Sequence, residues 1–380
     1  MVTTSSTAKN IFYIIFIFDI ILNLIPTWRG GFIYQHIGLE IYGDLVITIS
    51  NTFNTIAFVL LLFSSGIKNS RYVNYVIVLS ILMLLSTAIN GAYDMLYKTF
   101  CFPLVMLGMF CCQQSDLSNK LLRTVLILMI LWSIIPVAYL PIAPYEHILY
   151  MHNTDNFNTL NTFCGFATHR NVYGFYAGLS LCFLFMQDNK KVFNWVAIIL
   201  LIIGLFMAAS RTALIGALVS ILFYRWKSIS KKYRVWIIIF GLIVVEVLFY
   251  YARIFESRIV SEDSGRDELY FAFLRQIWEN PFLGKGGNAM AMLDGELNPC
   301  HNFLLQTAAD YGLFALLVFG AFLWRLYSDS NLEAKTILLF LLITGLFQPY
   351  FSLKFPLQQA LVAYLLIVYC NNVTKTNITI

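Results

Sequence analysis

Long apolar runs, separated by short polar segments, make up most of the chain. They fall at about residues 11–26, 45–64, 72–89, 97–112, 121–140, 167–186, 192–209, 212–224, 235–251, 312–327, 336–351 and 356–370. Because about 20 apolar residues cross a bilayer as a helix, the pattern predicts an all-α, polytopic integral membrane protein with about 12 transmembrane helices. Several runs are short, so their helices should begin among polar neighbours or end in a re-entrant segment.

One boundary depends on a short polar step. The stretch 192–224 is interrupted only by Ser210, Arg211 and Thr212. A single helix over this stretch would exceed the length that a bilayer accommodates, so we divide it at this step. We find no internal repeat, and residues 1–380 are expected to form a single transmembrane domain.

Composition excludes several other classes of protein. Of the 380 residues, 59% are hydrophobic and 12% are charged, whereas soluble proteins average about 25% charged. An ordinary cytosolic enzyme, a disordered protein and a nucleic-acid binder are therefore excluded. The seven cysteines lack metal-ligand spacing, so we expect no metal and no cofactor. The first apolar run follows a single lysine without a cleavage site and is interpreted as an uncleaved span.

The distribution of Lys and Arg sets the expected orientation. With a cytoplasmic N-terminus, 15 of the 25 basic residues lie inside, including the cluster from Arg225 to Arg234, and both termini are cytoplasmic in the cell inner membrane. The outer side receives seven Arg, three Lys and all five His. This outer arginine is either scatter in a small sample or the sign of an anionic substrate, which we favour because Arg binds phosphate with paired hydrogen bonds. The outer basic residues are Arg29, Lys98, Arg170, Arg211, Arg253, Arg258, Arg266, Arg275, Lys285 and Lys354.

Two of the predicted outer loops are long, 141–166 and 252–311, and the second carries most of the charged chemistry. Within the second loop, apolar residues at helical spacing from Tyr270 to Trp278 predict an amphipathic helix over 265–280. Its apolar face should lie on the membrane surface or on the helix bundle. Arg266 would occupy the first turn, where free N–H groups and the helix dipole favour an anion.

Two later features of this loop carry alternative interpretations. The segment Gly284 to Gly287 lacks P-loop spacing, and a plain turn is favoured over a close backbone approach to a substrate. Asn298 suits an N-cap and Pro299 the first helical position, which would put His301 in the first turn at the mouth of the tenth span. A neutral imidazole there could accept a proton from a hydroxyl nucleophile, and we favour this role over plain polar surface.

Arginines also stand at two other outer helix boundaries. Arg211 lies between two apolar runs, where it either reaches the lipid headgroups or binds substrate; we favour substrate. His169, Arg170 and Asn171 open the run at 167–186 on the same predicted face.

These motifs, taken in order, resemble those of a known family. They are Ser210-Arg211-Thr212-Ala213, then Gly265-Arg266, then Trp278-x-x-Pro281-x-x-Gly284-x-Gly286, then His301-Asn302-x-x-Leu305-Gln306, then Tyr311-Gly312. With the multi-span hydropathy and the large late loop, the chain resembles the superfamily of O-antigen polymerases and O-antigen ligases over about residues 165–325. The first 160 residues resemble it only in hydropathy, and the 141–166 loop offers no matching motif, so acceptor recognition is unassigned.

The resemblance implies a metal-independent, membrane-embedded glycosyltransferase. Its donor would be a glycan on undecaprenyl diphosphate at the outer face, with the lipid diphosphate as leaving group. Arg211 and Arg266 match arginines that bind the diphosphate, and His301 matches a histidine that assists the acceptor hydroxyl. We add candidate substrate-binding residues beside these motifs, namely His169, Arg170, Asn171, Arg275 and Asn302.

The leading interpretation is a polymerase that uses undecaprenyl-diphosphate-linked repeat units as both donor and acceptor, with membrane lipid around it and a chain-length regulator as a further partner. The second is a ligase that transfers the finished glycan to the lipid A core. A transporter or flippase would need charged residues along a path through the spans, whereas the charges here gather at one face. The sequence leaves open the sugar, the linkage and a pairing of Cys164 with Cys300.

Overall fold

The computed structural model describes residues 72–96, 116–145, 152–153, 162–167, 170–187, 191–236, 266–293 and 295–348, with the single positions 52, 56, 99, 148, 239, 241, 353 and 367. The predicted runs at about 11–26, 45–64, 97–112, 235–251 and 356–370 lie wholly or largely outside these residues, as does the start of the large loop, 252–265. Those parts of the interpretation stay predictions.

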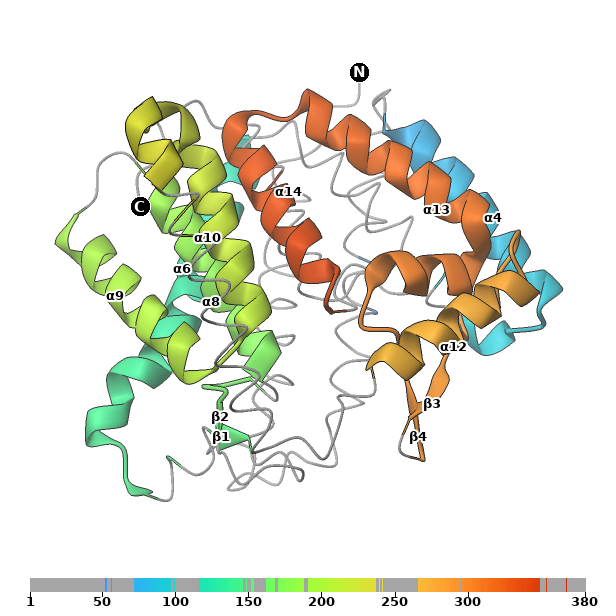
Figure 1. Ribbon diagram of the computed structural model, residues 1–380, viewed down its shortest axis with the longest axis horizontal. Coiled ribbons are helices and arrows are strands. Elements are labelled where there is room, and N and C mark those ends of the chain that lie inside the picture. Colours follow the sequence, from blue (N-terminus) through green and yellow to red (C-terminus); the bar gives the residue numbers. More distant parts are fainter. Residues whose placement is uncertain are drawn as a thin grey trace.

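The described part of the chain is mostly helical (Figure 1). Its α-helices are α4 (Val73–Ile89), α6 (Asp116–Tyr139), α8 (Arg170–Met186), α9 (Val192–Met207), α10 (Arg211–Arg225), α12 (Arg266–Glu279), α13 (Phe303–Asp329) and α14 (Leu332–Gly345). Short 3₁₀ turns are η3 (Tyr93–Met95), η4 (Leu140–Ile142) and η5 (Trp226–Ser228). Two antiparallel hairpins complete it, β1 (His152–Asn153) with β2 (Thr162–Phe163), and β3 (Ala291–Leu293) with β4 (Glu296–Asn298).

Every predicted apolar run that falls in the described residues forms a helix. The division of 192–224 is confirmed, because α9 ends at Met207 and α10 begins at Arg211. Between them Ala209 has φ +47°, a left-handed conformation that a continuous helix cannot contain. By length and composition, two helical stretches suffice to cross a membrane, Arg123–Ile142 and Phe303–Asp329, in the part of the chain that is described. The full number of spans stays a prediction.

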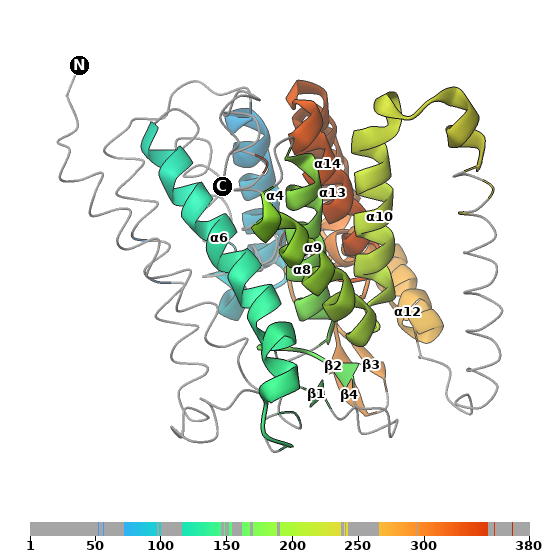
Figure 2. The ribbon, with the colours of Figure 1, turned by 90° about the vertical axis from the view of Figure 1, so that its left-hand side faces the viewer.

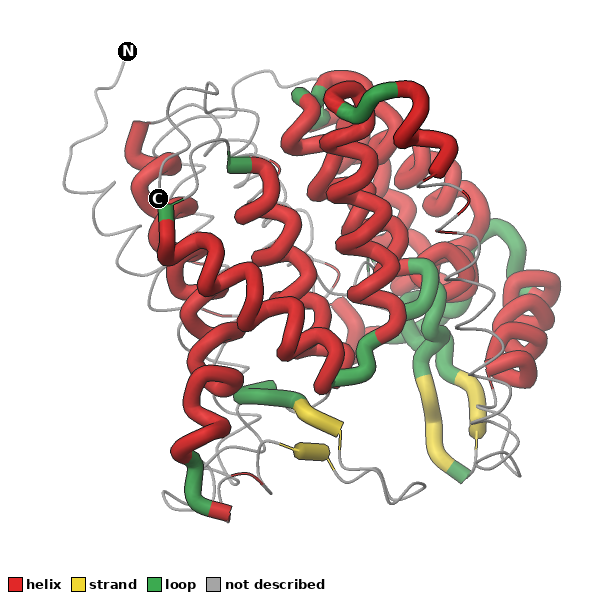
Figure 3. Tube along the Cα trace, turned by 60° about the vertical axis from the view of Figure 1, so that its left-hand side comes forward, coloured by secondary structure: helices red, strands yellow, loops and turns green. Residues whose placement is uncertain are grey.

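The helices run between two ends of the bundle. α8 and α10 begin at the lower end of Figures 1 and 2, whereas α14 begins at the upper end. Both hairpins lie at the lower end (Figure 3). The C-terminal end of α10, which carries Arg225, lies at the opposite end. The helix ends that bear the predicted inner and outer basic residues are therefore separated along the bundle.

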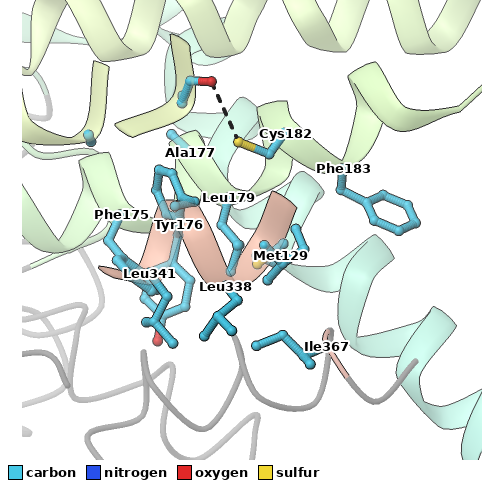
Figure 4. Close-up of a cluster of buried hydrophobic side chains, with 14 of the residues drawn as sticks. Met129, Phe175, Tyr176, Ala177, Leu179, Cys182, Phe183, Leu338, Leu341 and Ile367 are labelled. Carbon is cyan, nitrogen blue, oxygen red and sulfur yellow. Dashed lines mark hydrogen bonds between the residues drawn. The ribbon is translucent and has the colours of Figure 1, made fainter. Parts of the chain in front are cut away.

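Small residues allow α8, α10 and α14 to pack closely. A Cβ added to Gly174 of α8 would overlap the Ser210 hydroxyl, and one added to Gly178 would lie 2.9 Å from the Phe340 ring. Phe175 and Phe340 then meet with their ring centroids 5.5 Å apart. Figure 4 shows this contact region, where Phe175, Tyr176 and Leu179 of α8 lie against Leu338 and Leu341 of α14. Close packing of small residues is a common means of helix association in membranes.

The helix α13 is kinked, although the sequence indicated no break within it. Gly312 has φ +87° and ψ 170°, so the first part of α13 (303–311) turns away from the second. The helix predicted from Asn298 into the apolar run at 312 is present from Phe303 onward, and the structure adds the kink between its two parts. The first part packs on α12, and the contact between them forms a small second core around Leu269 and Phe273.

The all-α prediction missed the two hairpins. Each strand has only two or three residues. Strands so short carry no alternation of apolar and polar residues, which is the signal that identifies a strand in a sequence.

Candidate active site

Arg211 is the first residue of α10, and its side chain is exposed. One face of the following turns, with Ala213, Gly216 and Ala217, is buried. The N-cap residue Ser210 makes no side-chain hydrogen bond to the helix. The turn before it is closed by the backbone, since the Arg211 N–H donates to the Ala209 carbonyl at 3.0 Å. Arg211 therefore stands at the end of the bundle and not within it.

The starts of α8 and α10 meet around a small hollow. The Ser210 hydroxyl lies 3.5 Å from the Asn171 side-chain oxygen, and both residues line the hollow, whose volume of about 10 Å³ has room for about one water molecule. The complete lining is Asn171, Phe175, Ser210, Thr212, Ala213, Thr344 and Gln348. Two helix N-termini beside one hollow bring two positive dipole ends together, an arrangement that favours an anion.

Sequence reasoning named Ser210 and Thr212 only as parts of a motif, and it missed two further polar residues of this hollow, Thr344 and Gln348. Thr344 lies at the C-terminal end of α14, which packs against α10, and Gln348 follows that end. Their signal in the sequence was weak, since each is a single uncharged polar residue near the end of an apolar run. Only the packing of α14 on α10 reveals that they join Asn171 and Ser210.

The predicted amphipathic helix over 265–280 is confirmed as α12 (Arg266–Glu279). Arg266 is its first residue, about one turn before Tyr270 and two before Phe273. The predicted apolar face is divided. Phe273 is buried, whereas Trp278 is 87% exposed. The helix therefore uses one side against the bundle and leaves other aromatics outside.

Arg275 occupies a position on the opposite side of α12 from position 266, because nine residues make two and a half helical turns. Its side chain is 83% exposed, and its guanidinium pairs with Glu279 at 3.2 Å. Arg275 and position 266 therefore lie on opposite faces of α12. His169, another candidate, lies outside the described residues.

The expected N-cap before His301 was wrong. Asn298 belongs to β4, where it pairs with Ala291, and Asn302 is the N-cap of α13. The Asn302 side-chain oxygen accepts from the N–H groups of Leu304 and Leu305 at 2.9 and 3.2 Å. His301 thus lies immediately before the helix and not in its first turn. The pairing of β4 with β3 takes the chain past Asn298 in an extended form.

Gln306 and Asp310, both fully or almost fully buried, hold the segment around His301. The Gln306 amide donates to the Ala289 carbonyl at 3.1 Å and to an Asp310 oxygen at 2.8 Å. The other Asp310 oxygen accepts from the Ala289 N–H at 2.9 Å. The Gln306 side-chain oxygen accepts from the Cys300 N–H at 2.7 Å, directly before His301.

Cys300 and Cys164 are both buried, and no disulfide joins them. Burial raises the pKa of the Cys300 thiol to about 11. The negative charge of Asp310 raises this pKa further, whereas a hydrogen bond with the Asn302 backbone lowers it. The thiol therefore stays protonated at neutral pH.

The segment from Gly284 to Gly287 is a structural turn, as the favoured interpretation predicted. Its N–H groups bind the carbonyls that the kink of α13 leaves without helical partners. The Lys285 N–H donates to the Ala309 carbonyl at 2.9 Å, and the Gly287 N–H donates to the Asp310 carbonyl at 3.0 Å. The Ser86 hydroxyl of α4 donates to the Leu283 carbonyl and accepts from the Gly286 N–H. The glycines permit close approach to other parts of the protein.

The structure gathers several predicted residues at one end of the bundle. Arg170 and Asn171 open α8 and Arg211 opens α10, and these two helix starts lie together beside the lower end of α14. In Figure 1 the starts of α12 and α13, which carry Arg266 and follow His301, point toward that same end of α14. In the part of the chain that is described, no group of three His, Cys, Asp or Glu is placed to hold a metal ion.

Comparison with known proteins identifies a family for part of the chain. A family model described as O-antigen ligase matches residues 196–320, which run from α9 to the middle of α13. The match supports the resemblance of this part of the chain to the O-antigen ligase and polymerase superfamily. No curated protein matches the chain. The O-antigen match includes Arg211, Arg266 and His301, and it indicates a membrane enzyme of the glycosyltransferase type.

Proposed function

We propose that this protein is a polymerase that joins undecaprenyl-diphosphate-linked oligosaccharide repeat units into a surface polysaccharide at the outer face of the inner membrane. One observation carries the proposal. The helices α8, α10 and α12 each begin with an arginine, and the starts of α8 and α10 lie side by side, linked by Ser210 and Asn171. This grouping suits a diphosphate, which needs several positive groups at one place.

In this mechanism Arg211 and Arg170 bind the diphosphate of the donor, together with the free N–H groups at the start of α10. Arg266 supports the same anion from the start of α12. An acceptor hydroxyl attacks the anomeric carbon of the donor glycan, and the bond from that carbon to the diphosphate oxygen breaks. His301 accepts the hydroxyl proton, and undecaprenyl diphosphate leaves with the electron pair.

The polar residues around the hollow have a supporting role in this scheme. The amides of Asn171 and Gln348 and the hydroxyl of Thr212 are candidate donors to the anion, while the Ser210 hydroxyl donates to the Asn171 side-chain oxygen and so orients that amide. Asn302 is used differently, because its oxygen caps α13 and so fixes the residue after His301. Since arginine supplies the charge in this mechanism, activity should persist in excess chelator.

The test is the glycan profile of a deletion strain. Loss of a polymerase leaves lipid A core that carries a single repeat unit, and expression of the cloned protein restores the long chains. A normal chain-length distribution in the deletion strain would exclude the proposal. A transporter is tested separately, because purified protein that converts lipid-linked repeats into chains cannot be one.

A ligase is the second candidate, and the description of the matching family model favours it. The same strain separates the two functions. Loss of a ligase leaves bare core while lipid-linked polymer accumulates, whereas loss of a polymerase leaves core with one repeat unit.

A further inference from the structure

Four buried groups form a continuous hydrogen-bonded network behind His301. They are the peptide of Ala289, the Gln306 amide, the Asp310 carboxylate and the Cys300 N–H. We propose that Gln306 and Asp310 are positioning residues that fix the backbone of His301 for proton transfer. This inference rests on the proposed role of His301 as the proton acceptor.

The network determines the orientation of the Gln306 amide. Its nitrogen donates to two acceptors, the Ala289 carbonyl and an Asp310 oxygen, so its oxygen must face the Cys300 N–H. A flipped amide would put its oxygen against two acceptors and its nitrogen against a donor. Asp310 fixes this orientation because it has no hydrogen of its own to donate when ionised.

His301 is held from both sides as a result. The residue before it, Cys300, is tied to Gln306, and the residue after it, Asn302, is tied to the start of α13 by its own side chain. Gln306 also donates its backbone N–H to the Asn302 carbonyl at 2.9 Å. A histidine that must meet a hydroxyl within hydrogen-bond reach benefits from this fixed backbone.

The pattern of donors and acceptors predicts how substitutions combine. Gln306→Met removes the link to Cys300. Asp310→Asn puts an amide nitrogen against either the Gln306 nitrogen or the Ala289 N–H, so a buried donor is left without an acceptor. Adding Gln306→Glu to Asp310→Asn reverses the donor and acceptor between the two side chains, and the introduced carboxylate can still accept from the Cys300 N–H. The Ala289 carbonyl loses its side-chain donor in this double variant, so its recovery should be partial.

The experiment measures Cys300 labelling and chain extension in the full-length protein. The probes are iodoacetamide, quantified by peptide mapping, and lipid-linked repeat units taken from the deletion strain. We expect Gln306→Met and Asp310→Asn to label at Cys300 about 10-fold faster and to lose kcat by about 10- to 100-fold with KM unchanged. The double variant should exceed the kcat of Asp310→Asn by about 3-fold or more.

Gln276→Met is the matched control. Gln276 donates to the Met290 carbonyl at 2.8 Å, next to the same turn, and this hydrogen bond leads to neither Cys300 nor Asn302. Its labelling and kcat should match those of the native protein. If Gln276→Met lost as much activity as Gln306→Met, the hydrogen bonds would stabilise this segment in general, and the role of positioning His301 would be rejected.

The outcomes separate this inference from the proposed function. Native kcat in Gln306→Met and Asp310→Asn, or a double variant no more active than Asp310→Asn, overturns the inference. If the single variants do not fold, the double variant decides: folded protein that extends chains supports the inference, and folded but inactive protein overturns it. If His301→Ala keeps native chain extension, the proposed catalytic role fails, while Cys300 labelling still reports whether the network holds the backbone.

Discussion

At the scale of single residues, the arginines that begin helices are unfavourable for the helices themselves. A cation at a helix N-terminus opposes the helix dipole, whose positive end lies there. Arg170, Arg211 and Arg266 nevertheless each occupy the first position of a helix. Residues that oppose local stability at helix starts are consistent with the proposed diphosphate ligand, which would offset their charge.

We therefore expect activity and stability to respond differently at these positions. Arg211→Ala, Arg266→Ala and His301→Ala should each abolish chain extension while the protein is still expressed. Arg211→Ala should not lower the melting temperature in the absence of substrate, because it removes a cation from the start of α10. Glycan profiles and thermal melts of the purified variants measure the two effects.

Arg325→Ala is the control for the arginine variants. Arg325 pairs with Asp329 at 2.9 Å near the C-terminal end of α13, at the opposite end of the bundle from Arg211. Its removal should leave chains of normal length. Near-normal chains from Arg211→Ala or Arg266→Ala would remove that arginine from the proposed site.

Cys300 provides a prediction about pH. A pKa of about 11, against the ordinary 9.0, leaves about 100-fold less thiolate at pH 8. Alkylation of folded Cys300 should therefore be slow and should keep rising up to about pH 11, whereas in denatured protein it should level off above pH 9. Peptide mapping after timed alkylation gives both curves. Coinciding curves would show that the thiol is not buried as the structure describes.

At the scale of elements, the kink in α13 and the turn before it form one unit. The Leu313 N–H, which follows the kink, donates outside its own helix to the Pro281 carbonyl at 2.8 Å. The Ala309 and Asp310 carbonyls, which the kink leaves without helical donors, accept hydrogen bonds from the N–H groups of Lys285 and Gly287. A kink in a helix of this length is stable because other backbone groups satisfy the broken hydrogen bonds.

Gly312→Ala should break this unit. A Cβ there would overlap the Phe282 carbonyl, and the φ of +87° is itself unfavourable for alanine. We expect a loss of at least about 2 kcal/mol of stability from strain and overpacking together. Gly320→Ala, in the same helix with open space around its Cβ, should stabilise by up to about 1 kcal/mol. Detergent melts of the two variants compare them, and equal effects would contradict the kink.

The sequence predicted these elements unevenly, for physical reasons. Hydropathy sufficed for α8, α9 and α10, and the polar step at Ser210 located the turn between two of them. It could not predict the kink, because the backbone groups that satisfy it, at Pro281 and in the turn 284–287, are distant in the sequence. Asn298 was taken as an N-cap because its local signal is the same as that of Asn302, and only the β3–β4 pairing distinguishes them.

At the scale of the whole molecule, charge and chain direction agree. α10 begins with Arg211 at the end where the site lies and finishes with Arg225 at the other. The basic segment after it, 225–234, continues with exposed lysines at Lys227, Lys231 and Lys232. Lysine-rich segments stay on the cytoplasmic side of a membrane, so the bundle should place its arginine end on the outer side, where lipid-linked glycans would be used.

This orientation can be tested with two introduced cysteines. Leu297 is 64% exposed in β4 at the lower end of the bundle, and Lys232 is exposed in the basic segment at the other end. In intact spheroplasts, a membrane-impermeant maleimide should label Leu297→Cys above the background of the parent protein. It should label Lys232→Cys only after the membrane is permeabilised. Labelling of both positions from the same side would show that the two ends do not face opposite sides of the membrane, and labelling of Lys232→Cys alone would invert the orientation and place the arginine end in the cytoplasm.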